Sequence, residues 1–220
     1  MITLWGRRSS ANVQKVLWAL GELALQFDRK TVGGAFGGTR DEAYLRMNPN
    51  ALVPALQDGD VTMFESNAIV RYLAARYHPG VLQPAEWPRR AAAEQWMDWQ
   101  QNSLAAPVVS IFMNTVRSDL QPGSPAAVEA AQAAINRAFA IADAHLASNA
   151  WFAGSEFSFG DIVAAVFLWR YRGMGYSFAD FAHLSRWFAS ATDRAAFKAH
   201  VELPVARTLE EWTQIERQLA

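Results

Sequence analysis

Two segments of the chain place polar side chains at the start of a predicted helix. Glu65 and Ser66 follow two β-type runs joined by an Asp-Gly turn at residues 58–59, and a helical pattern of apolar residues comes directly after them. Ser10 precedes the apolar spacing of an earlier helix, where its hydroxyl can accept a hydrogen bond from a free backbone N–H. The first turn of a helix offers such N–H groups and the positive end of the helix dipole. The layout around Glu65 and Ser66 therefore predicts a binding site for a small anionic ligand.

The elements that carry these residues form an α/β unit in the first part of the chain. The sequence predicts strands at residues 2–5, 27–32, 52–56 and 61–64, and helices that follow residues 10, 41 and 65. The order is β-α-β-α-β-β-α, so the first two strands, which a helix connects, should pair in parallel and the hairpin strands should pair antiparallel. We expect a compact mixed sheet.

The second part of the chain is predicted to be helical throughout. Residues 78–88 hold three prolines and a glycine without any periodic pattern, which is typical of a linker. We therefore divide the chain into an α/β domain at residues 1–78, a linker at 79–88 and an all-α domain at 89–220. Ser158 and Asp161 have the spacing of a capping box, and the helix after them is apolar nearly all round. That helix should lie at the centre of the second domain.

The composition excludes several classes of function. With 20 basic and 21 acidic residues and a net charge of −1, the chain shows no footprint for nucleic acid. It has no cysteine, so thiol chemistry would need the sulfur of a ligand. The four histidines lack ligand spacing, and we predict no metal site. Charges or glycines break the apolar runs, and the N-terminus lacks signal-peptide features, so we expect a cytoplasmic protein without a membrane partner.

The central motif resembles a known signature. Four segments recur in the order of the glutathione-binding signature of cytosolic glutathione S-transferases: residues 48–49 (NP), 53–56 (VPAL), 65–69 (ESNAI) and 72–73 (YL). The box at residues 158–161 resembles that family's helical-domain capping motif. Residues 10–16 resemble the first helix of its serine-type members, the theta and phi classes and their bacterial relatives. The resemblance covers essentially the whole chain. It implies a thioredoxin-like N-terminal domain, an all-helical C-terminal domain and a homodimer.

The resemblance also implies how glutathione is held as co-substrate. Pro54 matches the family's cis-proline, which would turn the backbone N–H and C=O of Val53 toward the cysteinyl unit like an added strand. Glu65 and Ser66 match the pair that holds the γ-glutamyl end. Ser66 and the N–H groups of the helix start would donate to the α-carboxylate, while Glu65 would face the α-ammonium. Both residues can serve as a helix cap at the same time.

Ser10 matches the family's catalytic serine. A free thiol has a pKa of about 8.5, and a hydroxyl that donates to sulfur at the positive end of a helix dipole favours the thiolate. A fall of about two pKa units requires roughly 2.7 kcal/mol, which one hydrogen bond to a charged group plus a helix terminus can supply. Ser10 would then act as an electrostatic stabiliser and not as a nucleophile. Asn12 on the same turn and the adjacent Ser9 are alternative contacts for the sulfur, with Asn12 placed second, and a plain helix cap is the other interpretation of Ser10.

Two further positions concern the affinity for glutathione. Arg40 falls where phi-like members place a basic residue for the glycyl carboxylate, a good target for a guanidinium. A solvated surface charge is the alternative interpretation of Arg40. Leu52 departs from the family pattern, which often has a polar side chain just before the Val-Pro pair. Any contact at Leu52 must therefore use the backbone, and the affinity for glutathione should suffer.

The expected activity is a detoxification reaction in which a glutathione transferase conjugates the thiolate to a hydrophobic electrophile. Isomerisation, dehalogenation or peroxide reduction at the same site, and a non-catalytic binding protein of the same fold, are the alternatives. The electrophile pocket should be lined by the first long helices of the second domain and the loop after Trp5. The candidate lining residues are Arg8, Val108, Phe112, Met113 and Arg172.

Overall fold

The first part of the chain forms the predicted succession of strands and helices. The computed structural model describes residues 1–117, 119–120 and 122–219. The elements of the α/β unit are β1 (Ile2–Trp5), α1 (Ala11–Glu22), β2 (Phe27–Lys30), α2 (Glu42–Met47), β3 (Ala55–Asp58), β4 (Val61–Phe64) and α3 (Ser66–Tyr77), with a 3₁₀ turn at Gly34–Phe36. The predicted order is confirmed. The strand expected at residues 52–56 begins only at Ala55, because Pro54 has no N–H to donate to the sheet.

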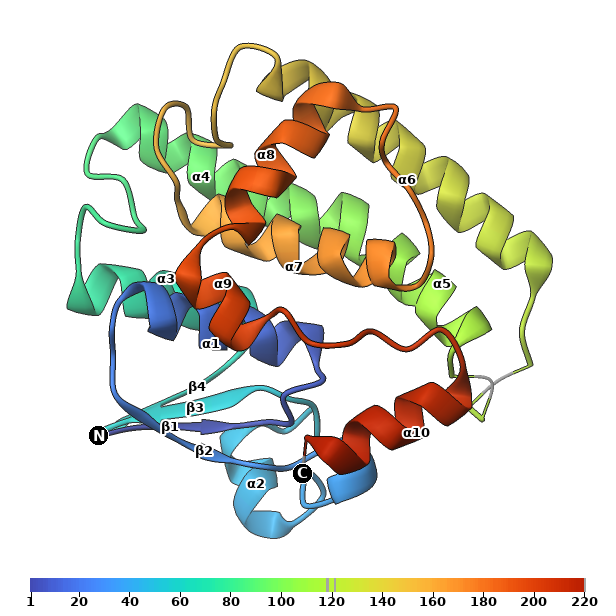
Figure 1. Ribbon diagram of the computed structural model, residues 1–220. Coiled ribbons are helices and arrows are strands. Elements are labelled where there is room, and N and C mark those ends of the chain that lie inside the picture. The colour runs from blue at the N-terminus through green and yellow to red at the C-terminus, as the bar shows by residue number, and fades with distance from the viewer. Residues whose placement is uncertain (118, 121, 220) are drawn as a thin grey trace.

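The four strands form one mixed sheet in the order β2-β1-β3-β4. β1 pairs with β2 in parallel, and both the β1–β3 and the β3–β4 pairs are antiparallel, as predicted. In the hairpin, Gly59 adopts a φ of 58°, a left-handed conformation that glycine adopts at little cost. Helices α1 and α3 cover the face of the sheet that is turned toward the helical half of the molecule, and α2 lies on the other side (Figure 1).

The second part of the described chain is helical. Its elements are α4 (Trp87–Trp99), a π-helical stretch (Gln100–Ala105), α5 (Ala106–Thr115), α6 (Pro125–Leu146), α7 (Phe159–Gly173), α8 (Ala182–Thr192), α9 (Ala195–His200) and α10 (Leu209–Gln218). α4 begins at Trp87, inside the segment predicted as a linker, and the division of the chain at residues 78 and 88 stays a prediction. Across the described residues, none of the helices combines the length and apolar character needed to cross a bilayer.

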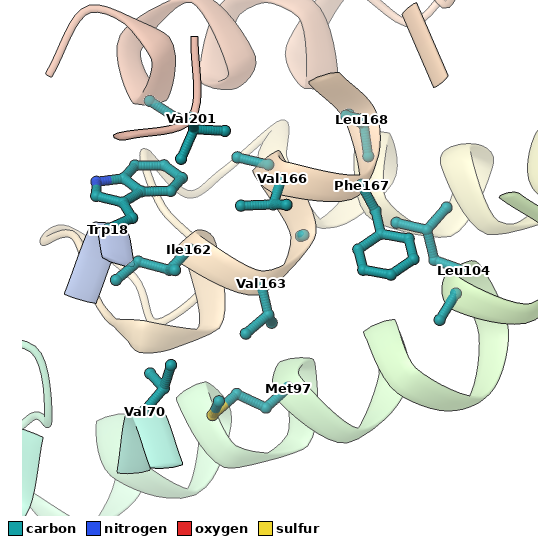
Figure 2. Close-up of a cluster of buried hydrophobic side chains, with 14 of the residues drawn as sticks. Trp18, Val70, Met97, Leu104, Ile162, Val163, Val166, Phe167, Leu168 and Val201 are labelled. Carbon is teal, nitrogen blue, oxygen red and sulfur yellow. The ribbon is translucent and has the colours of Figure 1, made fainter. Parts of the chain in front are cut away.

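Helix α7 lies at the centre of the core, as its apolar sequence predicted. Figure 2 shows its side chains meeting side chains from α1, α3 and α4. Trp18 of α1 and Val70 of α3 are fully buried there together with Ile162 and Val166 of α7. The α/β unit and the helices therefore share one continuous core. At roughly 25 cal/mol per Å² of buried apolar surface, this contact is a major source of stability.

The C-terminal helix α10 returns to the α/β unit. After α9 the chain crosses the molecule, and α10 lies near the 3₁₀ turn of the N-terminal half (Figure 1). Glu216 of α10 forms an ion pair with Arg7, with 3.4 Å between the Nε and Oε1 atoms. Its second partner, described below, is Ser9. The loop after β1 is thus fixed by a helix that lies far away in sequence.

The predicted capping box at the start of α7 is present. Asp161 is fully buried, and its carboxylate accepts hydrogen bonds from the backbone N–H and hydroxyl of Ser158, the backbone N–H of Phe152 and the indole of Trp187. Burial raises the pKa of Asp161 to about 6, while these four donors act in the opposite direction. The carboxylate is therefore ionised at neutral pH and joins the start of α7 to two other segments of the helical half.

Replacing Asp161 should destabilise the fold strongly. Asp161→Ala leaves four buried donors without an acceptor, and we expect a loss of about 3–5 kcal/mol in the free energy of unfolding, measured with urea at pH 7. Asp180→Ala removes an exposed carboxylate and serves as the control, with an expected change within about 0.5 kcal/mol. Equal, small losses in the two variants would show that the capping box contributes little.

Candidate functional site

A cavity of about 390 Å³ opens between the α/β unit and the helical half. One wall comes from the N-terminal part of the chain and the other from α5, α7 and α10. Its lining includes Arg7, Ser9, Ser10, Asn12, Gly33, Thr39, Leu52 and Val53 on the first side, and Val109, Phe112, Met113, Arg117, Phe167, Arg170 and Trp212 on the second. The cavity therefore joins a polar side to a largely aromatic and aliphatic one.

Ser10 lies at the N-cap of α1, where it lines the cavity. Its carbonyl accepts from the backbone N–H of Gln14 at 2.9 Å, so the backbone of Ser10 begins the helix. Within the described residues its side chain makes no capping hydrogen bond. Gly6 permits the tight entry into the helix, because a Cβ atom there would lie 2.4 Å from a methyl carbon of Val13. The Ser10 hydroxyl is therefore placed at the positive end of α1 and can turn toward a ligand.

Ser9, in contrast, is occupied by the rest of the protein. It is only 5% exposed, and its hydroxyl donates to the carboxylate of Glu216. Its carbonyl accepts from a terminal nitrogen of Arg170 at 2.5 Å. A ligand that used the Ser9 hydroxyl would have to displace Glu216. This geometry favours Ser10 over Ser9 as the contact for a bound sulfur.

Asn12 connects the starts of two helices. It is exposed and lines the cavity, and its side-chain oxygen accepts from the hydroxyl of Ser66 at 3.3 Å. Ser66 is buried as the first residue of α3, whereas Glu65 before it is exposed and has a φ of 70°. Neither Glu65 nor Ser66 belongs to the cavity lining, and they lie beyond Asn12. The polar groups of α1 and α3 thus form one edge that leads away from Ser10.

The segment before β3 presents its backbone to the cavity. The Val53–Pro54 peptide bond is cis, as the resemblance implied, and Val53 lines the cavity. The carbonyl of Leu52 accepts from the hydroxyl of Tyr44 at 2.7 Å and from the side-chain amide of Asn48 at 2.8 Å. Burial raises the pKa of Tyr44 to about 12, so its hydroxyl remains a donor. Leu52 is 66% exposed, and its apolar side chain offers no polar group to a ligand, as expected from the residue type.

Arg40 is not brought to the cavity that Ser10, Asn12 and Val53 line. It is exposed, and the lining contains its neighbour Thr39 instead. A contact between Arg40 and the glycyl carboxylate therefore stays a prediction. Within the described residues, no group of three or more His, Asp or Glu side chains is placed to hold a metal ion.

The predicted lining of the electrophile pocket was correct for two of its five residues. Phe112 and Met113 line the cavity, but the third residue of this face of α5 is Val109, because Val108 points into the core. Arg172 was also wrong. It lies two positions, and so more than half a helical turn, beyond Arg170, and it lines a separate surface hollow.

Arg8 was wrong for a similar reason. Its guanidinium donates to the carbonyl of Ala199, and Arg7 lines the cavity in its place. Arg170 and Trp212 also line the cavity, although neither was predicted from the sequence. Arg170 could have been noticed, because it is a basic residue in a helix that is otherwise apolar on nearly every side and therefore needs a specific partner.

Comparisons with known proteins match this arrangement. The family model for the glutathione S-transferase N-terminal domain matches residues 1–75, and the model for the C-terminal domain matches residues 102–194. The chain is 42% identical to glutathione S-transferase GstB of Escherichia coli K12. The match extends over 208 residues, which are 94% of this chain and 100% of that protein. The chain belongs to the glutathione S-transferase family. It is a glutathione transferase by this relationship.

Two further relatives support the same conclusion. A theta class glutathione S-transferase from Xanthomonas axonopodis pv. citri, solved with glutathione bound, superposes with a TM-score of 0.88 and 38% identity, covering 93% of this chain and 99% of that one. Glutathione S-transferase F10 of Arabidopsis thaliana is 29% identical over 206 residues, which is 89% of this chain and 95% of that protein. The thioredoxin-like domain followed by a helical domain is therefore the fold of a known family.

A buried lysine lies behind the helix starts of this transferase. Lys15 of α1 is fully buried and donates to the side-chain oxygens of Asn67 and Gln100, each at 3.1 Å. Its ammonium group lies 4.7 Å from the ring centroid of Phe167. Burial lowers the pKa of Lys15 to about 7, and the nearby charge of Glu65 offsets part of this effect. Lys15 therefore joins α1, α3 and the π-helical stretch through a cation that is costly to bury.

The low pKa of Lys15 predicts a pH dependence of stability. The unfolded chain keeps the Lys15 proton to a pH near 10.5, whereas the native protein releases it near pH 7, so the free energy of unfolding rises with pH between these values. We expect the native protein to gain about 2 kcal/mol more than Lys15→Met between pH 7 and pH 9, measured by urea unfolding. Lys30→Met, at an exposed lysine of β2, should retain the native dependence. Parallel curves for the native protein and Lys15→Met would contradict the prediction.

Proposed function

We propose that this transferase conjugates the thiolate of glutathione to a hydrophobic electrophile and that Ser10 stabilises the thiolate. The observation that carries the proposal is the position of the Ser10 hydroxyl, which is free of a capping bond and shares a cavity with Phe112 and Trp212. In the reaction the sulfur forms a bond to the electrophilic carbon, the leaving group departs with its bonding electron pair, and the thiol proton passes to solvent. The Ser10 hydroxyl donates to the sulfur and lowers the thiol pKa.

In this proposal glutathione lies along the edge from Val53 to α3. Its cysteinyl unit pairs with the backbone of Val53, and its γ-glutamyl end reaches Glu65 and Ser66. The continuous line of Ser10, Asn12 and Ser66 supports this orientation, because Asn12 bridges the two helix starts. Asn12 accepts from Ser66 through its oxygen, so its side-chain N–H groups remain available as a second donor near the sulfur.

The glycyl end of glutathione lies toward Arg40 in this proposal. Arg40 is assigned to the glycyl carboxylate only by the resemblance, and its exposed position requires the side chain to fold back toward Thr39. The relative from Xanthomonas that was solved with glutathione bound supports glutathione as the ligand. The contribution of Arg40 should be small, because an exposed ion pair is typically worth less than about 1 kcal/mol.

The role of Ser10 is tested with Ser10→Ala. Losing one hydrogen bond to a charged sulfur should lower kcat/KM with a generic aryl halide about tenfold to a hundredfold and raise the pKa of bound glutathione, read from the ultraviolet absorbance of the thiolate. Glu65→Gln is the matched comparison, because it should raise KM for glutathione and leave the thiol pKa unchanged. Unaltered turnover and thiol pKa in Ser10→Ala would remove Ser10 from the mechanism and direct attention to Asn12.

We further propose a cytoplasmic homodimer. The cytoplasmic location is supported by the co-substrate, since glutathione is a principal thiol of that compartment. The dimer is supported by apolar side chains that stay exposed on the edge strand β4, Val61 and Phe64. Sedimentation of the purified protein should give twice the chain mass of 24.4 kDa, and the Val61→Asp/Phe64→Asp variant should sediment as a monomer. A native protein that sediments at 24.4 kDa would contradict the dimer.

A further inference from the structure

Three arginines line the cavity. Arg7 belongs to the side formed by the N-terminal part of the chain, whereas Arg117 and Arg170 belong to the opposite side, which is otherwise largely aromatic and aliphatic. A cavity that received only neutral apolar molecules would gain nothing from guanidinium groups, because burying a charge is costly. These side chains therefore need an explanation beyond the reaction of a neutral electrophile.

Arg170 is the most deeply placed of the three. It is 8% exposed, and one terminal nitrogen donates to the carbonyl of Ser9, while its Nε atom is buried and has no hydrogen-bond partner in the described residues. Its guanidinium lies 5.1 Å from the ring centroid of Phe112. Burial lowers the pKa of Arg170 to about 10, with a further contribution from Arg7 and an opposing one from Glu216. Arg170 therefore remains a cation at neutral pH and has an unused donor.

The other two arginines flank the indole of Trp212. The Arg7 guanidinium lies 6.0 Å and the Arg117 guanidinium 5.8 Å from a ring centroid of that residue. The Nε atom of Arg7 lies 3.4 Å from the Oε1 atom of Glu216 in an ion pair, although it makes no hydrogen bond in the described residues. Arg117 is bound by both oxygens of Asp119, at 2.8 and 2.9 Å.

The charges in this corner of the cavity do not balance. Two carboxylates, Glu216 and Asp119, face three guanidinium groups, and Glu216 also accepts from the hydroxyl of Ser9. One positive charge is therefore left over, beside the Nε donor of Arg170 that has no partner in the described residues. A guanidinium prefers a carboxylate as its partner, since the two groups match in geometry and charge.

We infer that the electrophile is an acid: an aromatic or unsaturated molecule whose carboxylate is bound by Arg7, Arg117 and Arg170 while its apolar body lies against Phe112 and Trp212. This inference rests on the proposed conjugation and names the class of its second substrate. The glycyl carboxylate of glutathione is the competing occupant of the arginines, and the experiment below distinguishes the two.

The probes are 4-chloro-3,5-dinitrobenzoate and its methyl ester. They share the ring and the leaving group and differ in the charge of one substituent. With either probe the glutathione sulfur forms the C–S bond, the C–Cl bond breaks, chloride leaves with the bonding pair and the thiol proton goes to solvent. Dividing each kcat/KM by the rate constant of the uncatalysed reaction with glutathione removes the difference in intrinsic reactivity.

The native transferase should prefer the acid over the ester by about tenfold or more, the size of one hydrogen bond to a charged group. Arg7→Gln and Arg117→Gln should each lower this preference several-fold, mainly through KM for the acid. Arg117→Gln should disturb the fold less than Arg7→Gln, because Arg117 is partly exposed and its partner Asp119 lies two residues away in the chain. Arg137→Gln, at an exposed arginine of α6 outside the cavity, should retain the native preference.

A binding measurement separates this inference from the proposed activity. The two glutathione conjugates, acid and methyl ester, are titrated against the native protein and Arg117→Gln by tryptophan fluorescence, and the native protein should bind the acid conjugate about tenfold more tightly. An ester preference in both assays would overturn the inference and leave the conjugation intact. Absence of turnover with both probes would overturn the conjugation, while tighter binding of the acid conjugate would still support the anion site. A raised KM for glutathione in both arginine variants, with an unchanged acid-to-ester ratio, would assign the arginines to glutathione and overturn the inference.

Discussion

The junction between the loop after β1 and the helical half determines the geometry of the site. Arg170 of α7 donates to the carbonyl of Ser9, and Glu216 of α10 accepts from the hydroxyl of the same residue. Ser9 is thereby fixed on two sides, and the next residue, Ser10, is left at the mouth of the cavity. The role proposed for the Ser10 hydroxyl needs such support, because small displacements of a reacting group cost large factors in rate.

This junction also explains why both halves of the chain are needed for one site. The α/β unit supplies the helix starts and the backbone of Val53, while α5, α7 and α10 supply the wall that faces them. The shared core around α7 keeps the two parts in register (Figure 2). Since the core and the site use the same helix, a change that loosens α7 should weaken ligand binding as well as stability.

Much of the fold was predictable because its signals are local. The apolar spacing of α1 and α3, the Gly59 turn of the hairpin and the box of Ser158 and Asp161 each specify an element within a short window. The wall of the cavity was not predictable in this way. Arg7 rather than Arg8 faces inward because Glu216, more than two hundred residues away in sequence, holds its guanidinium. Contacts of that separation have no pattern in the neighbouring sequence.

Two buried basic side chains, Lys15 and Arg170, also contribute to the site, and the sequence indicates their role only in part. Lys15 belongs to α1 and Arg170 contacts Ser9 just before that helix, and both are buried at the contact between the two halves. Neither forms an ion pair in the described residues, since their hydrogen-bond partners are amide or carbonyl oxygens. Arg170 stays protonated at neutral pH and therefore adds a positive charge beside the segment that leads into α1, where the helix dipole is also positive. In the proposed reaction, this fixed charge and the helix dipole would stabilise the thiolate together with the single hydroxyl of Ser10.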